Sequence, residues 1–213
     1  MKLWKKVLAA VTAGMLCLGC AGVSGLQGVL GSVSAVLPVC AAENDTAYTV
    51  TVPVGTRTTQ LTYTVNADDT VEITDCENDA AGDLEIPAEI DGKTVTSMGY
   101  YSFSYCANLT SVIIPNGVAN IGDNAFGNCE KLENITIPSS VTNIGDRSFA
   151  GCENLTSVII PNSVENIGYS AFDGCTSLAE ITIPSSVTSI GGNAFLDTPW
   201  LAARQEENPL VIV

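Results

Sequence analysis

The sequence contains no histidine, and it has only 8 Lys and Arg residues against 23 Asp and Glu. Without histidine, the chain lacks the side chain that most often serves as a general base near neutral pH and as a zinc ligand. It also lacks the G-x-S-x-G, H-E-x-x-H and Walker-type motifs of common hydrolases, metalloproteases and nucleotide-binding enzymes. We therefore expect that the protein is not an enzyme and that it holds no cofactor or metal ion.

Basic residues are especially scarce after residue 42. All 23 acidic residues lie at or after Glu43, whereas only five basic residues follow that point, so the charge balance there is 5 − 23 = −18. Such a field repels phosphate backbones, and we expect no nucleic acid partner. The acidity also keeps an exposed protein soluble. The basic residues are Arg57, Lys93, Lys131, Arg147 and Arg204.

The first 42 residues read as an export signal. A Lys-rich start precedes a long uncharged apolar stretch, and small residues stand before Glu43, which suits cleavage after Ala41 or Ala42. We therefore predict an extracellular or cell-surface protein. Two alternatives stay open. The apolar stretch is longer than a usual signal core, which leaves room for an uncleaved membrane anchor, and Cys20 could carry a lipid although its flanking residues depart from the bacterial lipobox.

The later part of the chain repeats itself with a period of 23 residues. "NLTSVIIPNGVANIGDNAF" begins at Asn108, and "NLTSVIIPNSVENIGYSAF" begins at Asn154. Between and after them stand "KLENITIPSSVTNIGDRSF" and "SLAEITIPSSVTSIGGNAF", which resemble each other more than their neighbours, so a weaker period of 46 is superimposed. A degenerate earlier unit contains Pro87, which stands 28 residues before Pro115 because the "IDGKTV" region adds five residues.

Five residue types recur in columns across these units. Apolar columns at this spacing indicate a solenoid, in which each unit buries its face only against its neighbours. The columns are Cys106, Cys129, Cys152 and Cys175; Pro115, Pro138, Pro161 and Pro184; Gly99, Gly122, Gly145, Gly168 and Gly191; Phe103, Phe126, Phe149, Phe172 and Phe195; and Leu109, Leu132, Leu155, Leu178 and Leu201.

Each unit combines one strand with tighter segments. In "LTSVIIP" the alternation directs Leu109, Val112 and Ile114 inward and Ser111 and Ile113 outward, which is the pattern of a half-buried strand. In the following "NGVANIGDNAFGNC" we expect a short extended piece, a tight turn at the glycine, and one helical turn over "DNAFGNC". The residues expected to point inward in this second part are Val118, Ile121, Phe126 and Cys129.

Five cysteines follow residue 42, an odd number for a disulfide framework. Four of them share a repeat column, in which neighbouring coils stack about 4.8 Å apart. We therefore predict a ladder of buried free thiols that act as small hydrophobic side chains. Thr198 occupies the next place in this column, which indicates that small volume matters there more than sulfur chemistry.

The repeat pattern L-x-x-V/I-x-I-P-x-x-V-x-x-I-G-x-x-A-F-x-x-C resembles the BspA-like, Treponema-type leucine-rich repeat family over residues 82–201. The resemblance implies a repeat solenoid, a leucine-rich-repeat-type curved coil of about five 23-residue units, with a parallel β-sheet on the concave face and short helical turns or extended pieces opposite. It also implies a bacterial exported or surface protein that binds other proteins, in some members those of a host. Ser148 and Met98 depart from the Ala and Ile of the pattern.

The resemblance and the strand alternation together predict a partner-binding face. The outward strand positions line the concave face in two rows, and in one of them Ile alternates with Thr. Ile and Thr both favour strands, so their presence also fits plain β-propensity. Binding through the convex loops around Asn124, Arg147 and Tyr169 is the alternative. The predicted face consists of Ser111, Asn134, Ser157 and Glu180 in one row and Ile113, Thr136, Ile159 and Thr182 in the other.

We divide the chain into a signal peptide over 1–42, an N-terminal β segment over 43–81, leucine-rich repeats over 82–198, and a short helix with a terminal "LVIV" strand over 199–213, which we expect to be incomplete. Thr198 is the predicted N-cap of that helix and Pro199 its first residue. The predicted function is an adhesin-like module that binds a host or neighbouring-cell surface protein. The alternative is a structural spacer that presents another domain, or an enzyme whose catalytic domain lies outside this chain.

Overall fold

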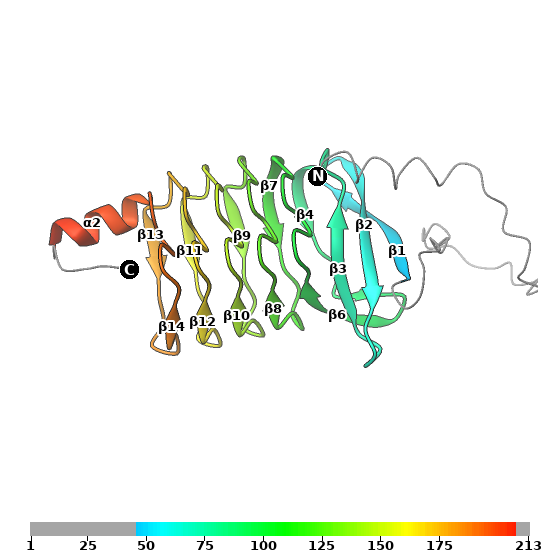
Figure 1. Cartoon of the computed structure of the whole chain (residues 1–213). Helices are drawn as coiled ribbons and strands as arrows, with labels where there is room; N and C mark the ends of the chain where they lie inside the picture. Colours follow the sequence, from blue (N-terminus) through cyan, green and yellow to red (C-terminus); the bar gives the residue numbers. More distant parts are fainter. Residues whose placement is uncertain (1–45, 208–213) are drawn as a thin grey trace, which may run out of the picture. The chain divides into compact units, whose positions relative to one another are not determined.

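The computed structural model describes residues 46–207, all within one compact unit, as a stack of β-coils followed by one helix (Figure 1). The predicted export signal and the predicted "LVIV" strand lie outside the described residues. Each coil contributes one strand to a first sheet and one to a second sheet, and from β7 onward the strand of the second sheet is the shorter. No helix among residues 46–207 is long and apolar enough to cross a membrane.

The first sheet contains the strand of each "LTSVIIP"-like segment. Its strands are parallel, and from β7 onward stacked residues lie 23 positions apart, as Ser111 and Asn134 do. The ladder joins β4 to β7 and β9, and separately β11 to β13, with no strand pairing between β9 and β11. The strands are β4 (Ala81–Glu85), β7 (Asn108–Ile113), β9 (Asn134–Thr136), β11 (Ser157–Ile159) and β13 (Glu180–Thr182).

The second sheet forms where the sequence predicts only a short extended piece. Its strands are parallel and pair without interruption from β6 to β14, again at an offset of 23 residues within the repeats. From β8 onward two residues per coil are enough to form a continuous sheet, because every coil places its hydrogen-bonding groups at the same position. The strands are β6 (Lys93–Met98), β8 (Asn120–Ile121), β10 (Asn143–Ile144), β12 (Asn166–Ile167) and β14 (Ser189–Ile190).

An antiparallel meander of β1 (Ala47–Val54), β2 (Arg57–Val65) and β3 (Val71–Cys76) closes the N-terminal end of the stack. Strand β3 pairs with β6 in the second sheet, and β1 meets β4 of the first sheet, so the meander links both sheets (Figure 1). The five extra residues of the first unit form a hairpin, in which β5 (Glu89–Ile90) pairs with β6.

The predicted columns form the core. The five column phenylalanines are fully buried and stack in one pile, with ring centroids between 4.9 and 5.6 Å apart and interplanar angles of at most 12°. Leu109, Val112 and Ile114 are buried, whereas Ile113 is 44% exposed, as the strand alternation predicts. The predicted inward residues Val118, Ile121, Phe126 and Cys129 are also fully buried.

The cysteine column is a ladder of buried free thiols, as predicted. Three thiols of the repeats each donate a hydrogen bond to a backbone carbonyl of the preceding coil: Cys129 to Phe103 at 3.2 Å, Cys152 to Phe126 at 3.2 Å and Cys175 to Phe149 at 3.1 Å. Cys76 of the meander continues the ladder, because it and Cys106 both lie 3.6 Å from the carbonyl oxygen of Glu77. The thiols therefore form hydrogen bonds between the coils in addition to the predicted packing contacts.

The turn expected at the column glycine is present, because Ala125 N donates to Gly122 O at 3.2 Å. A Cβ atom on Gly122 would lie 2.6 Å from the Met98 carbonyl oxygen, so glycine also allows close stacking of the coils. One local expectation needs correction. The "DNAFGNC" segment forms successive turns rather than one helical turn. Ala125 N donates within its coil to Gly122 O, while Phe126 N donates to Ser148 O of the next coil, and this alternation is incompatible with a helix.

Helix α2 (Pro199–Glu207) follows the last coil. The predicted N-cap is confirmed, because the Thr198 hydroxyl accepts a hydrogen bond from Leu201 N at 3.2 Å. Trp200 N donates to Leu178 O at 3.0 Å, and the Trp200 ring lies 4.9 Å from the Phe195 ring. The helix thus covers the end of the phenylalanine pile.

Candidate binding face

The first-sheet face consists of the outward side chains of β4, β7, β9, β11 and β13. Seven of the eight predicted binding residues are exposed there, and Ser111 is half-buried. Strand pairing brings them together in two groups of four, because Ser111 and Ile113 stack on Asn134 and Thr136, while the other four stack in the same way. The second group is Ser157, Ile159, Glu180 and Thr182.

The two isoleucines are the large apolar side chains of this face. Ile113 is 44% exposed and Ile159 is 77% exposed, although the preceding residues Val112 and Val158 are buried. Both isoleucines therefore place apolar surface in water, where a partner could remove it. Exposed apolar groups are common singly, but the recurrence of an exposed isoleucine at the same strand position in two coils makes this face a candidate contact surface.

A hollow of about 350 Å³ opens at the N-terminal end of the first-sheet face, where β1, β4 and β7 meet. Its lining includes Ser111 and Ile113 of the predicted face, together with Asp83 and Glu85 from β4, and Pro53. The two carboxylates are not among the predicted binding residues. The repeat pattern does contain their position, because the 28-residue offset between Pro87 and Pro115 also aligns Glu85 with Ile113, and these two residues are paired in the structure.

The electrostatic character of this region is acidic. Asp83 and Glu85 are exposed at the hollow, and Glu180 is exposed further along the same face. Asp83 Oδ1 accepts a hydrogen bond from the Thr110 hydroxyl at 2.8 Å, which fixes its position. No Lys or Arg lines the hollow within residues 46–207. The arrangement suits a partner that offers apolar and basic side chains.

The alternative residues of the turns lie at a different surface. The Arg147 guanidinium lies 5.2 Å from the centre of the Tyr169 ring, and Asn193 Nδ2 donates to the Tyr169 hydroxyl at 3.1 Å. Asn124 has a positive φ of 55° and lies in the series of turns over the "DNAFGNC" segment. A depression of about 360 Å³ on the second sheet is lined by residues that include Asp123, Asp146 and Tyr169. Through Arg147 and Asn193, Tyr169 therefore already contacts side chains of both neighbouring coils.

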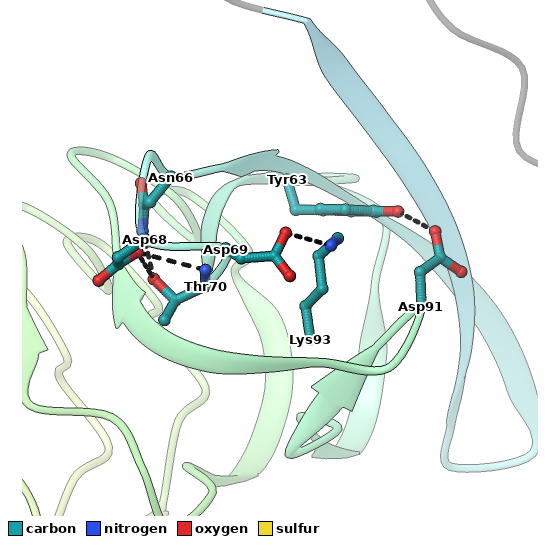
Figure 2. A network of polar contacts seen from close by, with 7 residues as sticks. All are labelled: Tyr63, Asn66, Asp68, Asp69, Thr70, Asp91 and Lys93. Atoms are coloured by element: carbon teal, nitrogen blue, oxygen red, sulfur yellow. Dashed lines mark hydrogen bonds and ion pairs between the residues drawn. The ribbon is translucent and has the colours of Figure 1, made fainter.

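A polar network holds the meander against the β5–β6 hairpin (Figure 2). The Tyr63 hydroxyl donates to Asp91 at 2.6 Å, and Lys93 forms an ion pair with Asp69. Burial, together with the bond to Asp91, raises the pKa of Tyr63. Asp68 accepts bonds from the Thr70 hydroxyl and backbone, and these lower its pKa. These carboxylates therefore position the N-terminal part of the stack.

The buried thiols are held in the neutral, protonated form, which does not suit nucleophilic chemistry. Burial raises the pKa of Cys129 to about 12, and burial likewise raises the pKa of Cys152. For Cys106 the main cause of the raised pKa is its contact with Cys76, followed by burial. Because the thiolate is the reactive form, thiols held neutral in this way are poor nucleophiles. Across residues 46–207, no three His, Cys, Asp or Glu side chains are placed to share a metal ion.

These observations define the class of the protein. It is a parallel β-solenoid of 23-residue coils with a stacked phenylalanine core and an exposed strand face. The chain belongs to the family described as the BspA type leucine rich repeat region, which matches residues 88–203 in six copies. The family and the fold class predicted from the repeat columns are therefore confirmed.

Solved structures of bacterial leucine-rich repeat proteins are similar to this chain. A leucine-rich repeat protein of T. pallidum is 32% identical with a TM-score of 0.61, over 63% of each chain. A leucine-rich repeat protein of Bacteroides ovatus is 40% identical with a TM-score of 0.57, over 63% of this chain and 37% of its own. A leucine-rich cell surface protein of Faecalibacterium prausnitzii is 33% identical with a TM-score of 0.60, over 66% and 36%.

The chain therefore spans 63% of the T. pallidum protein and little more than a third of the other two. No curated protein is similar enough in sequence to match. The similarity covers the coils and extends over about two thirds of this chain.

Proposed function

We propose that this protein is a non-catalytic module, exported or held at the cell surface, that binds a partner protein through the first-sheet face. The observation that carries the proposal is the pair of exposed isoleucines, Ile113 and Ile159, among the otherwise polar outward side chains of the first-sheet face. An exposed β-branched side chain on a rigid sheet loses little conformational freedom when a partner covers it. Rows at fixed spacing also present one surface across several coils.

The sequence and a relative support the location. The uncharged apolar stretch within residues 1–42 follows a Lys-rich start, which is typical of an export signal. One similar structure belongs to a protein described as a cell surface protein. We propose an adhesin-like role for this chain, with a surface protein of a host or of a neighbouring cell as the partner. The acidic balance after residue 42 favours a partner with a basic contact surface.

Site-directed photo-crosslinking tests this proposal. The full chain carries a photoreactive residue in place of Ile159, and in a control version in place of Asn143, which lies on β10 of the second sheet. Each is exposed to the surface proteins of the candidate host or neighbouring cell. We expect a discrete protein adduct from position 159 and none from position 143, and the Ile113→Glu, Ile159→Glu double variant should lose binding to the crosslinked protein.

The outcome separates the remaining alternatives. An adduct from a residue at the turns, such as Tyr169, with unchanged binding by the double isoleucine variant, would move the site to that surface. No adduct at any of these positions would favour the structural spacer instead. Circular dichroism of the double variant should match the parent chain, because both isoleucines are exposed.

A further inference from the structure

Strand β1 has one edge that no described strand covers along most of its length. It pairs with β2 from Ala47 to Val54, but on its other side it meets β4 at a single pair, Val54 with Leu84. The two strands diverge from that point. The hollow lined by Pro53, Glu85 and Ile113 lies at this divergence, on the first-sheet face.

The hairpin register shows which backbone groups face the open edge. Val54 and Arg57 flank the two-residue turn that contains Gly55, so they form a hydrogen-bonded pair, and bonded pairs then alternate along β1. The backbone groups of Thr49 and Thr51 therefore point away from β2, toward the open edge. Pro53 occupies an edge-facing position of the same kind, where its missing N–H costs no bond to β2.

An open edge with regular backbone donors and acceptors is a template for one more strand. In β-strand addition, main-chain hydrogen bonds provide affinity, and pockets beside the edge select the side chains of the added strand. Here the adjacent pocket combines the apolar Ile113 with the carboxylates of Asp83 and Glu85. A basic side chain with an aliphatic stem matches this combination, because its stem packs on the isoleucine while its charge meets the acids.

We propose that the open edge of β1 and the adjoining hollow bind an extended segment of the partner protein, by strand addition, with a Lys or Arg side chain in the hollow. This proposal rests on the proposed protein-binding function and identifies the kind of segment that is bound. A second copy of this chain is the less suitable occupant. Strand β1 itself carries no Lys or Arg, so a second copy paired along this edge would offer no basic side chain to the carboxylates of the hollow.

The probe is a displayed library of random eight-residue peptides, selected against the full chain. We expect enriched peptides to carry Lys or Arg beside β-branched residues, and nuclear magnetic resonance should show downfield shifts of the Thr49 and Thr51 amide protons when they bind. The Asp83→Asn, Glu85→Gln double variant should weaken binding about tenfold through loss of both charges. Glu130→Gln with Glu153→Gln removes the same charge from exposed side chains elsewhere and should leave binding unchanged.

Several results would overturn the proposal: no enrichment of basic residues, equal binding by the two double variants, or unchanged Thr49 and Thr51 amides at saturation. Backbone N-methylation of an enriched peptide should abolish binding, because strand addition needs the peptide N–H groups. The two proposals can fail separately. If Ile159→Glu releases the crosslinked partner while the Asp83 and Glu85 variant keeps it, the first-sheet face binds but the β1 edge does not. If neither variant releases it, the proposed function fails as well.

Discussion

At the N-terminal end of the coil stack the meander hydrogen-bonds to both sheets, whereas at the C-terminal end helix α2 covers only one corner of the last coil. The isoleucine column of the second sheet shows the consequence. Ile121 and Ile144 are fully buried and Ile167 is 2% exposed, but Ile190 in the last coil is 40% exposed. The helix lies over Phe195, which stays fully buried, and leaves β14 without a further described strand.

This difference indicates that the coils differ in their local stability. A coil is buried by its neighbours alone, so the quality of the cap decides how firmly the terminal coil is held. The N-terminal cap supplies backbone pairing, buried aromatic packing and the network of Figure 2. The C-terminal cap supplies the Trp200 ring contact, a backbone hydrogen bond from Trp200 to Leu178 and the buried side chain of Leu201. We therefore expect local opening to begin at the last coil.

The largest expected effect compares the central aromatic residues of the two caps. Tyr63 is 1% exposed and stacks on Tyr48 at 5.5 Å, so Tyr63→Ala should lower the free energy of unfolding by about 3–5 kcal/mol. Trp200 is only partly buried, and Trp200→Ala should cost about 2 kcal/mol. Urea denaturation measures both. Equal costs would mean that the two caps contribute alike, and would contradict the comparison.

A second prediction uses one column to compare the middle of the stack with its end. Ile144→Ala removes fully buried methyl groups and leaves a cavity, so it should cost about 3 kcal/mol. Ile190→Ala removes the same atoms from a side chain that is 40% exposed, and should cost less than about 1 kcal/mol. Urea denaturation again provides the measurement. If Ile190→Ala proved as costly as Ile144→Ala, some cover outside the described residues would have to shield β14.

Most of the fold could be predicted because the repeats report the core directly. A residue that recurs every 23 positions must occupy one stacked position, so Phe126 and Cys129 could be placed inside without any structure. What the repeats do not report is backbone conformation. Arg147 and Ser170 adopt a positive φ of 51°, although neither residue type favours it. The column imposes this conformation through bonds between coils, such as Arg147 N to Tyr169 O.

The candidate face was partly accessible to sequence reasoning for the same reason. Alternation along a strand identifies Ile113 and Ile159 as outward, and the structure exposes both. The hollow and the β1 edge were not accessible, because they depend on how β1 meets β4 at Val54 and Leu84. That contact joins segments outside the repeat, where no column fixes the register.

A third prediction concerns the effect of pH on the thiol ladder. The pKa of Cys129 is raised by burial to about 12, above the value of about 9 in the unfolded chain. As the pH rises above about 9, the unfolded chain releases this proton first, so the free energy of unfolding is constant below about pH 8 and falls between about pH 9 and 12. At about pH 10.5 the loss should be about 2 kcal/mol for this thiol.

Urea denaturation of the parent chain and of Cys129→Ala at about pH 8 and 10.5 isolates this contribution. The variant should be less stable at the lower pH because it loses packing, yet it should lose about 2 kcal/mol less than the parent as the pH rises. Parallel losses in both chains would show that the Cys129 thiol does not control the effect. Thr198, in the next place of the ladder after Cys175, contributes no such pH dependence.

The smallest effect tests the last place in that ladder. The Thr198 hydroxyl donates to Phe195 O at 2.7 Å and accepts from Leu201 N at 3.2 Å, so it both closes the last coil and caps helix α2. Thr198→Ala should cost about 1 kcal/mol, the usual value of an N-cap. Thr198→Ser keeps both bonds and should restore most of the loss. Thr198→Cys keeps the volume of the side chain in the ladder, but its sulfur accepts hydrogen bonds weakly, so this variant should be about as unstable as the alanine variant.

Hydrogen exchange measures where the chain opens. Exchange of the Leu201 amide should become faster in the alanine and cysteine variants, while exchange of the Phe126 amide in an inner coil stays unchanged, because the last coil opens independently. If Thr198→Cys were as stable as the parent, volume alone would govern this position, and the C-terminal cap would not depend on the hydroxyl.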